Sequence, residues 1–137
     1  MLGSIEYLRY RVAERVKVEA GKIETKIATA QAKTAGHRHG PLCKLWCAKR
    51  RADTQCAALE TEVLLLRSCE DAIRTGATQD MLPILDRVVA HFKRSVPAQR
   101  LSMFFEGIFD SHALLRGSAF LEDYNAMVQL RGIYRTH

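Results

Sequence analysis

The chain has 137 residues, of which 47% are hydrophobic and 26% are charged. Such a chain is long enough for one domain with its own core, and apolar runs such as residues 63–66 are far too short to span a membrane. The N-terminus lacks the continuous apolar stretch of a secretory signal. These features predict a cytoplasmic protein without a membrane segment. All four cysteines lie within residues 43–69 of a helical stretch, which favours free thiols over a disulfide framework.

The formal net charge of +6 is unevenly distributed. Residues 1–51 carry twelve Lys and Arg against four Glu, whereas residues 52–137 carry nine against eleven acidic residues. This asymmetry indicates an acidic partner for the first third of the chain, such as nucleic acid, anionic lipid or an acidic protein surface. The alternative interpretation is a solvated helix surface without a partner.

The N-terminal part of the chain predicts one long helix. Residues 4–34 contain no proline and one interior glycine, Gly21. Their apolar positions recur every three or four residues, which places them in one stripe along a helix. Ser4 is expected to cap the start and Gly36 to end the helix. The stripe comprises Ile5, Leu8, Val12, Val16, Ala20, Ile23, Ile27 and Ala30.

A second long helix is predicted from Pro41 to the residue before Gly76. Proline is favoured in the first turn of a helix and glycine just after its end. Between them, apolar residues follow the seven-residue spacing of a coiled coil, interrupted by Lys49 and Glu70. Two long helices joined by a short turn are expected to fold back antiparallel as a hairpin. The seam residues are Leu42, Cys56 and Val63 on one heptad position and Leu45, Ala52, Leu59, Leu66 and Ile73 on the other.

Three shorter helices are predicted after the hairpin. Thr78 or Asp80 is expected to cap the first of them. The next starts at Pro97 and is expected to stop at Gly117, where the following serine caps the last helix. The apolar character of residues 101–130 predicts either the main core or, for part of the segment, a surface for a partner.

These elements together predict an all-α fold without a sheet, since no stretch alternates with a period of two. A long antiparallel helical hairpin, residues 4–75, is expected to pack against a compact, bundle-like unit of about three shorter helices, residues 78–134. Both would belong to a single domain, residues 1–137.

Histidine and cysteine side chains gather in the predicted turn of the hairpin, within the stretch GHRHGPLCKLWC. His37, His39, Cys43 and Cys47 offer two imidazoles and two thiols, the ligand types that Zn²⁺ prefers. However, all four lie within eleven residues, whereas zinc modules usually join two distant ligand pairs. Packing of the cysteines near the hairpin end, without a metal, is the favoured interpretation, and a zinc-stabilised turn is the alternative.

Basic residues crowd the same end of the hairpin. Such clustering is suited to phosphate contacts, and the tryptophan in this region could stack on a base or anchor in a partner. The alternative for the tryptophan is packing against the first helix. No helix-turn-helix, zinc-finger or RNA-binding signature accompanies the cluster. The candidate binding residues are Lys33, Arg38, Lys44, Trp46, Lys49, Arg50 and Arg51.

No set of catalytic residues can be assembled from the sequence. Asp110, Ser111 and His112 are adjacent, but neighbours on a helix point in different directions and cannot form a triad. A thiol near a helix N-terminus, Cys43 or Cys47, is the remaining option for chemistry. We therefore expect a protein that is not an enzyme and has no cofactor.

The first functional hypothesis is a helical protein–protein interaction module, either an adaptor, an inhibitor or an assembly factor, with homo-oligomerisation as one mode of binding. The second is a nucleic-acid-binding accessory protein that uses the basic hairpin end. The third is a zinc-stabilised version of either, through the four ligands named above.

Overall fold

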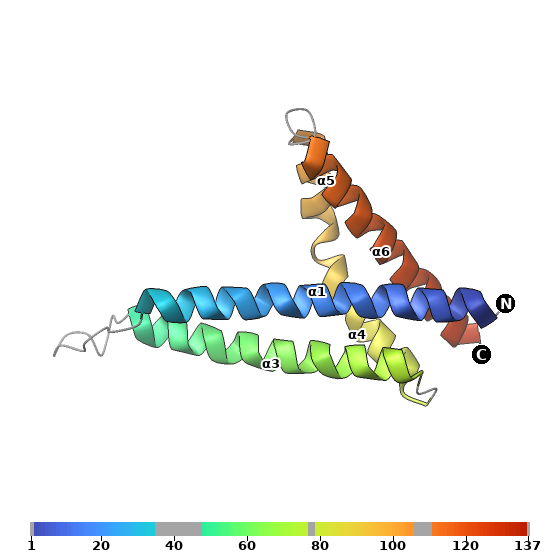
Figure 1. Cartoon of the computed structure of the whole chain (residues 1–137), viewed down its shortest axis with the longest axis horizontal. Coiled ribbons are helices and arrows are strands. Elements are labelled where there is room, and N and C mark those ends of the chain that lie inside the picture. Colours follow the sequence, from blue (N-terminus) through green and yellow to red (C-terminus); the bar gives the residue numbers. More distant parts are fainter. Residues whose placement is uncertain (1, 35–47, 77–78, 106–110, 137) are drawn as a thin grey trace. The chain divides into compact units, whose positions relative to one another are not determined.

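The computed structural model describes residues 2–34, 48–76, 79–105 and 111–136, and nearly all of them are helical (Figure 1). No strand occurs within these ranges, so the predicted all-α, bundle-like fold is confirmed. A membrane-crossing helix, long and apolar enough to span a bilayer, is not found among the described residues. The helices are α1 (Leu2–Thr34), α3 (Ala48–Thr75), α4 (Met81–Lys93), α5 (Val96–Phe105) and α6 (Ser111–Thr136).

The chain divides into two compact units, which are described separately. Unit 1 consists of Met1–Val16 together with Cys69–His137, and unit 2 consists of Lys17–Ser68. Each unit therefore contains a part of α1 and a part of α3. The division into sub-units 4–75 and 78–134 stays a prediction from the sequence.

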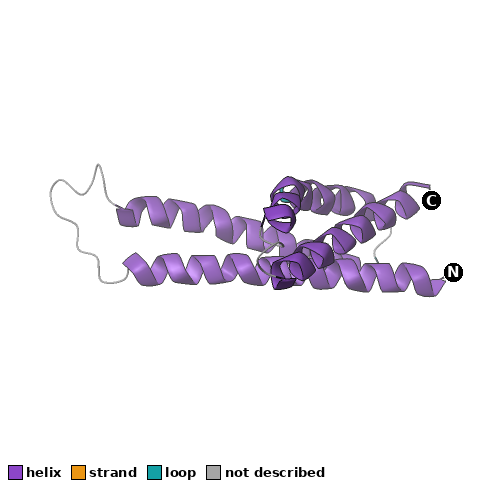
Figure 2. Cartoon of the chain, turned by 90° about the horizontal axis from the view of Figure 1, so that it is seen from above, coloured by secondary structure: helices purple, strands orange, loops and turns teal. Residues whose placement is uncertain are grey.

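Unit 2 is an antiparallel pair of helices. Its parts of α1 and α3 run side by side in opposite directions (Figures 1 and 2). Residues of both predicted stripes are buried in this unit, which confirms that part of the seam, whereas Ala30, Ala52 and Leu59 are only half-buried. Arg67 of α3 donates a hydrogen bond to Glu24 of α1 at 3.0 Å, along the edge of the seam. The buried residues are Ala20, Ile23 and Ile27 of α1 and Cys56, Val63 and Leu66 of α3.

In unit 1, α6 packs against both α4 and α5. The apolar residues of α4 recur every three or four positions, and this stripe is buried as its spacing requires. Phe92 of α4 packs against Phe120 of α6, with ring centroids 6.0 Å apart. The fully buried side chains of the unit include Val12, Ile73, Met81, Leu85, Val88, Phe92, Met127 and Leu130.

Glu70, which interrupts the apolar seam in the sequence, is buried with its charge compensated. Arg74, one turn later on α3, donates a hydrogen bond to Glu70 at 3.1 Å and another to Glu14 of α1 at 2.7 Å. The hydrogen bond with Glu14 is the main cause that raises the pKa of Arg74. Because a buried carboxylate is tolerated when it is paired and hydrogen-bonded, the seam accommodates this residue.

Two predicted helix boundaries are wrong. α1 begins at Leu2, so Ser4 lies inside the helix and is not its N-cap. Gly117 does not stop a helix, because α6 runs through it without interruption. A β-carbon at position 117 would collide with the side chain of Met103 on α5. This glycine therefore allows α5 and α6 to approach closely, which a sequence pattern cannot distinguish from a helix end.

The apolar residues of segment 101–130 are only partly buried. Phe120, Met127 and Leu130 belong to the core, as expected. In contrast, Leu101 and Phe104 of α5 are 59% and 67% exposed. These side chains are not part of the core, so the alternative prediction of a partner surface stays a prediction for this part of the segment.

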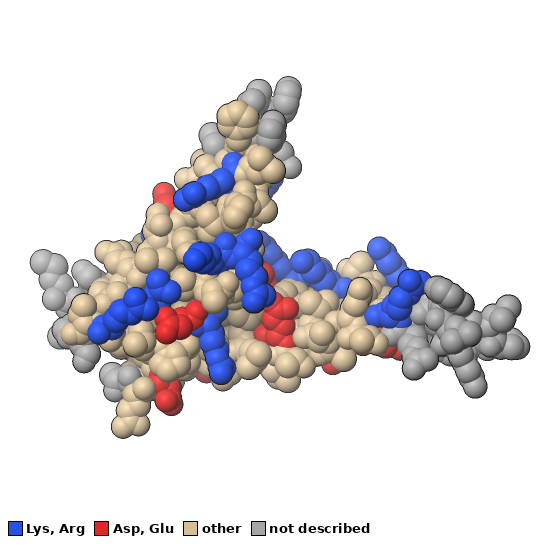
Figure 3. Space-filling model, turned by 180° about the vertical axis from the view of Figure 1, so that it is seen from behind, with Lys and Arg blue, Asp and Glu red and all other residues tan. Residues whose placement is uncertain are grey.

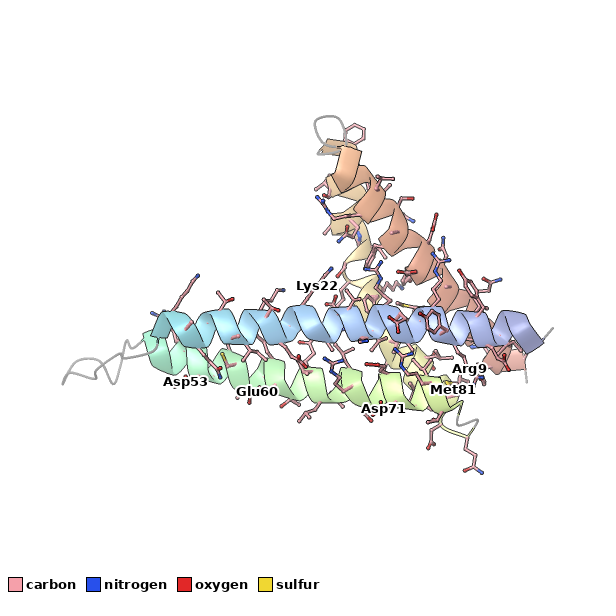
Figure 4. The ribbon with its side chains drawn as sticks, viewed as in Figure 1. Arg9, Lys22, Asp53, Glu60, Asp71 and Met81 are labelled. Atoms are coloured by element: carbon pink, nitrogen blue, oxygen red, sulfur yellow. The ribbon has the colours of Figure 1, made fainter. Side chains whose placement is uncertain are left out.

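Gly76 ends α3 as the sequence predicts, and it does so in the left-handed backbone region, with a φ of 73°. Its N–H donates a hydrogen bond to the carbonyl of Ala72 at 3.1 Å, which is the pattern of a left-handed helix cap. A β-carbon here would also collide with the guanidinium of Arg9 (Figure 4). The guanidinium is the end of a flexible side chain and can shift, so the left-handed backbone conformation is the feature that requires glycine.

Gly76→Ala is therefore expected to lower the free energy of unfolding by at least about 1–2 kcal/mol, the cost of a left-handed L-residue. Gly21→Ala is the matched control, because nothing lies within 4 Å of a β-carbon at that helical position. It is expected to raise stability by about 0.5–1 kcal/mol. Urea denaturation followed by circular dichroism measures both. If the two alanines had the same effect, the proposed strain at Gly76 would be refuted.

Candidate functional site

The structure places some of the predicted basic residues at one end of unit 2. Lys33 is exposed in the last turn of α1, and Lys49, Arg50 and Arg51 lie near the start of α3. Because the two helices are antiparallel in this unit, these positions lie at the same end of the pair (Figures 1 and 2). The other candidate residues, Arg38, Lys44 and Trp46, lie outside the described residues.

The predicted zinc ligands, His37, His39, Cys43 and Cys47, also lie outside the described residues, so the zinc hypothesis stays a prediction. Within the described ranges, no group of three or more His, Cys, Asp or Glu side chains could hold a metal ion. Cys56 and Cys69 are free and buried. Burial raises the pKa of the Cys69 thiol, although Arg87 opposes the effect. This thiol is therefore protonated at neutral pH, and it is a core residue.

A lysine face on α1, not recognised in the sequence, lies along unit 2. Lys22, Lys26 and Lys33 are all exposed, and at about 100° per residue their directions fall within about 40° of one another. We call these three residues the basic face. Figure 3 shows Lys and Arg side chains on this part of the surface, and Figure 4 labels Lys22. The three lysines are four and seven residues apart, a spacing that places side chains on one side of a helix. This spacing in the sequence is the signal that could have revealed the face.

The side of α3 that points away from α1 in unit 2 has no charged side chain between residues 54 and 68. All seven of its residues are exposed, and two of them are leucines, with exposed fractions of 70% for Leu64 and 50% for Leu65. Asp53 and Glu60 follow one edge of this surface (Figure 4), and Arg51 and Glu62 follow the other. We call the surface the outer face of α3; it comprises Thr54, Ala57, Ala58, Thr61, Leu64, Leu65 and Ser68.

A cluster of charged groups in unit 1 joins α1 to α6. Arg11 and Arg15 each donate a hydrogen bond to a different oxygen of Asp123, both at 2.6 Å. Arg15 also lies over the ring of Phe120, 5.8 Å from its centroid. The hydrogen bond with Asp123 is the main cause that raises the pKa of Arg11. Since all these groups are paired with one another, we assign the cluster to structural support and not to ligand binding.

Comparison of the chain with protein-family models, with curated proteins and with solved structures found no match. A function therefore has to be argued from the surfaces themselves. In unit 2 these are the basic face of α1 and the outer face of α3, and they differ in chemistry: one is cationic, and the other is uncharged with exposed leucines.

Proposed function

We propose that the protein is a non-enzymatic helical interaction module, an adaptor, inhibitor or assembly factor, which binds a helix of a partner protein on the outer face of α3. The observation that supports this proposal is a face of α3, over residues 54–68, that has no charged side chain and exposes two leucines. The face is about 21 Å long at 1.5 Å per residue, enough for about four turns of a partner helix.

The composition of the outer face suits helix packing. Ala57 and Ala58 are small and allow close approach, while Leu64 and Leu65 project beside them. Side chains of this kind form the ridges and grooves through which helices pack. Complete burial of a leucine contributes about 1.5–3 kcal/mol, so two leucines can supply much of the affinity of such a contact.

The edges of the face indicate the chemistry of the partner. Asp53, Glu60 and Glu62 are acidic, and Arg51 is basic. A partner helix with an apolar stripe and flanking Lys or Arg would match these charges. A second copy of the chain that paired antiparallel through the same face would place its own Asp53 and Glu60 beside Asp53 and Glu60 of the first copy. These like charges would repel each other. The proposal therefore names a different protein with a basic-edged amphipathic helix.

The double variant Leu64→Ser/Leu65→Ser is expected to lose partner binding while it keeps its stability. Both side chains are exposed, so the free energy of unfolding should change by less than about 0.5 kcal/mol. Proteins captured from the native host by the wild type should be absent from the variant's capture. A purified partner should then bind the variant at least about tenfold more weakly in calorimetric titration, because the buried leucine area is lost.

Leu101→Ser/Leu115→Ser is the matched control, since these leucines are 59% and 65% exposed but belong to unit 1. The control should capture the same partner as the wild type. Equal binding by the Leu64/Leu65 variant, or equal loss in both variants, would contradict the assignment of the outer face as the binding surface.

A further inference from the structure

Positive charge predominates on the basic face of α1. Lys22 and Lys33 are eleven positions apart, or about 16 Å along the helix axis, and Lys26 lies between them. Val18, Thr25 and Thr29 share this side of the helix and are uncharged, whereas Glu19 lies about 20° from the direction of Lys26. The surface therefore carries three lysines and one carboxylate over three turns.

One of the two carboxylates of α1 in unit 2 is turned away from the lysines. Glu24 points to another side of the helix, where it accepts a hydrogen bond from Arg67. Glu19 lies on the lysine side and is half-buried. The three lysines are exposed and outnumber this carboxylate, so the face keeps a net positive charge toward an external anion.

Basic residues also lie at the end of unit 2 where Lys33 is located. Lys33 is in the last turn of α1, and positions 49–51 of the antiparallel α3 are all basic. Residues 17–68 contain ten Lys and Arg against five Asp and Glu. This excess of positive charge is suited to a polyanion.

We propose that the basic face binds the phosphate backbone of duplex nucleic acid without selecting a sequence. Tight protein–protein contacts centre on Trp, Tyr or Arg anchors in desolvated pockets, and the basic groups of this face are all lysines. Lysine acts as a flexible point charge, which suits contacts with successive phosphates. The hydroxyls of Thr25 and Thr29 donate to their own helix, to the carbonyls of residues 21 and 25, so they offer no free donor for reading bases.

Nucleic-acid binding through this face is separate from the proposed function. The partner helix is assigned to the outer face of α3, whereas the phosphates are assigned to α1. Variants of one face leave the residues of the other unchanged, so each proposal can fail without the other.

The test uses the full chain and a fluorescent DNA duplex of about 24 base pairs, roughly 80 Å long at 3.4 Å per pair. Binding is measured by anisotropy between about 50 and 200 mM salt. The wild type should bind with a steep salt dependence. Lys22→Gln/Lys26→Gln/Lys33→Gln should bind at least about tenfold more weakly at the lowest salt. Its slope of log K against log salt should be smaller by about three, or about one for each lysine.

Two further variants make the result specific to the face. Lys93→Gln/Arg94→Gln/Arg100→Gln removes the same charge from exposed positions of unit 1 and should change the slope by less than one. Lys22→Arg/Lys26→Arg/Lys33→Arg keeps the charges and should bind like the wild type, with an unchanged helical signal. An unchanged slope in the glutamine variant of the face, or an equal loss in the unit 1 control, would overturn the proposal.

A poly-glutamate peptide with as many charges as the duplex tests the other class of partner. If it bound as tightly as the DNA and with the same dependence on the three lysines, the face would be assigned to an acidic protein instead. Failure of the wild type to bind the duplex at about 50 mM salt would also refute the proposal, because phosphate contacts are strongest at low salt.

Discussion

Phe92→Ala is expected to lower the free energy of unfolding by about 3–5 kcal/mol, the largest effect of any single substitution considered for this protein. Phe92 is 1% exposed, and it packs against Phe120 across the contact of α4 with α6. Its removal would leave a cavity that neighbouring side chains can only partly fill. Since folded domains are stable by about 5–15 kcal/mol, much of unit 1 should unfold under mild conditions.

Phe104→Ala is the control for this prediction, because it makes the same chemical change at a side chain that is 67% exposed. Its effect is expected to stay below about 1 kcal/mol. Thermal unfolding monitored by circular dichroism would measure both variants. Comparable losses of stability in the two would show that Phe92 is not a core residue of unit 1.

Asp123→Ala is expected to lower the free energy of unfolding by about 1.5–3 kcal/mol, which is the contribution of hydrogen bonds to charged groups. The carboxylate accepts hydrogen bonds from Arg11 and Arg15, and its side chain is only 15% exposed. Removing it would leave both guanidinium groups partly buried without this partner, and it would weaken the position of Arg15 over Phe120. The substitution therefore affects a charged pair and an aromatic contact together.

Glu122→Ala distinguishes this effect from the loss of any negative charge. Glu122 also pairs with Arg11, at 3.1 Å, but its side chain is 65% exposed. An exposed ion pair contributes at most about 1 kcal/mol and is screened by salt. Urea denaturation at low and high salt should show a large, salt-insensitive loss for Asp123→Ala. A loss of equal size for Glu122→Ala would argue against the special role of Asp123.

The predictions of local structure succeeded where they relied on the spacing of residues close in sequence. Most of the described residues in the stripe of α1 and in the seam of α3 are buried, although Ile5, Leu8 and Leu59 are only half-buried, and Gly76 ends α3. Helix periodicity and helix caps depend on interactions over three or four residues, which a sequence displays directly. The same reasoning failed for Gly117, because its role depends on Met103 of another helix.

The candidate sites show a similar division. Clustering of basic residues near the hairpin turn could be read from the chain, and the antiparallel pairing of unit 2 brings Lys33 and Arg51 to one end of that unit. The basic face and the outer face of α3 lie away from the predicted seam, and the structure established that their side chains are exposed. A helix has several possible faces, and only packing decides which of them remains in solvent.

The sequence by itself determined that this protein is all-α and built on two long helices, because the apolar period and the positions of glycine and proline are local properties. Only the tertiary structure decided which side chains pair with one another and which face solvent. Arg11 and Asp123, 112 residues apart, join α1 to α6, and Glu70 is buried beside Arg74. Lys22 and Leu64 instead face solvent. Pairing between distant residues is set by the packing of helices, and composition does not encode it.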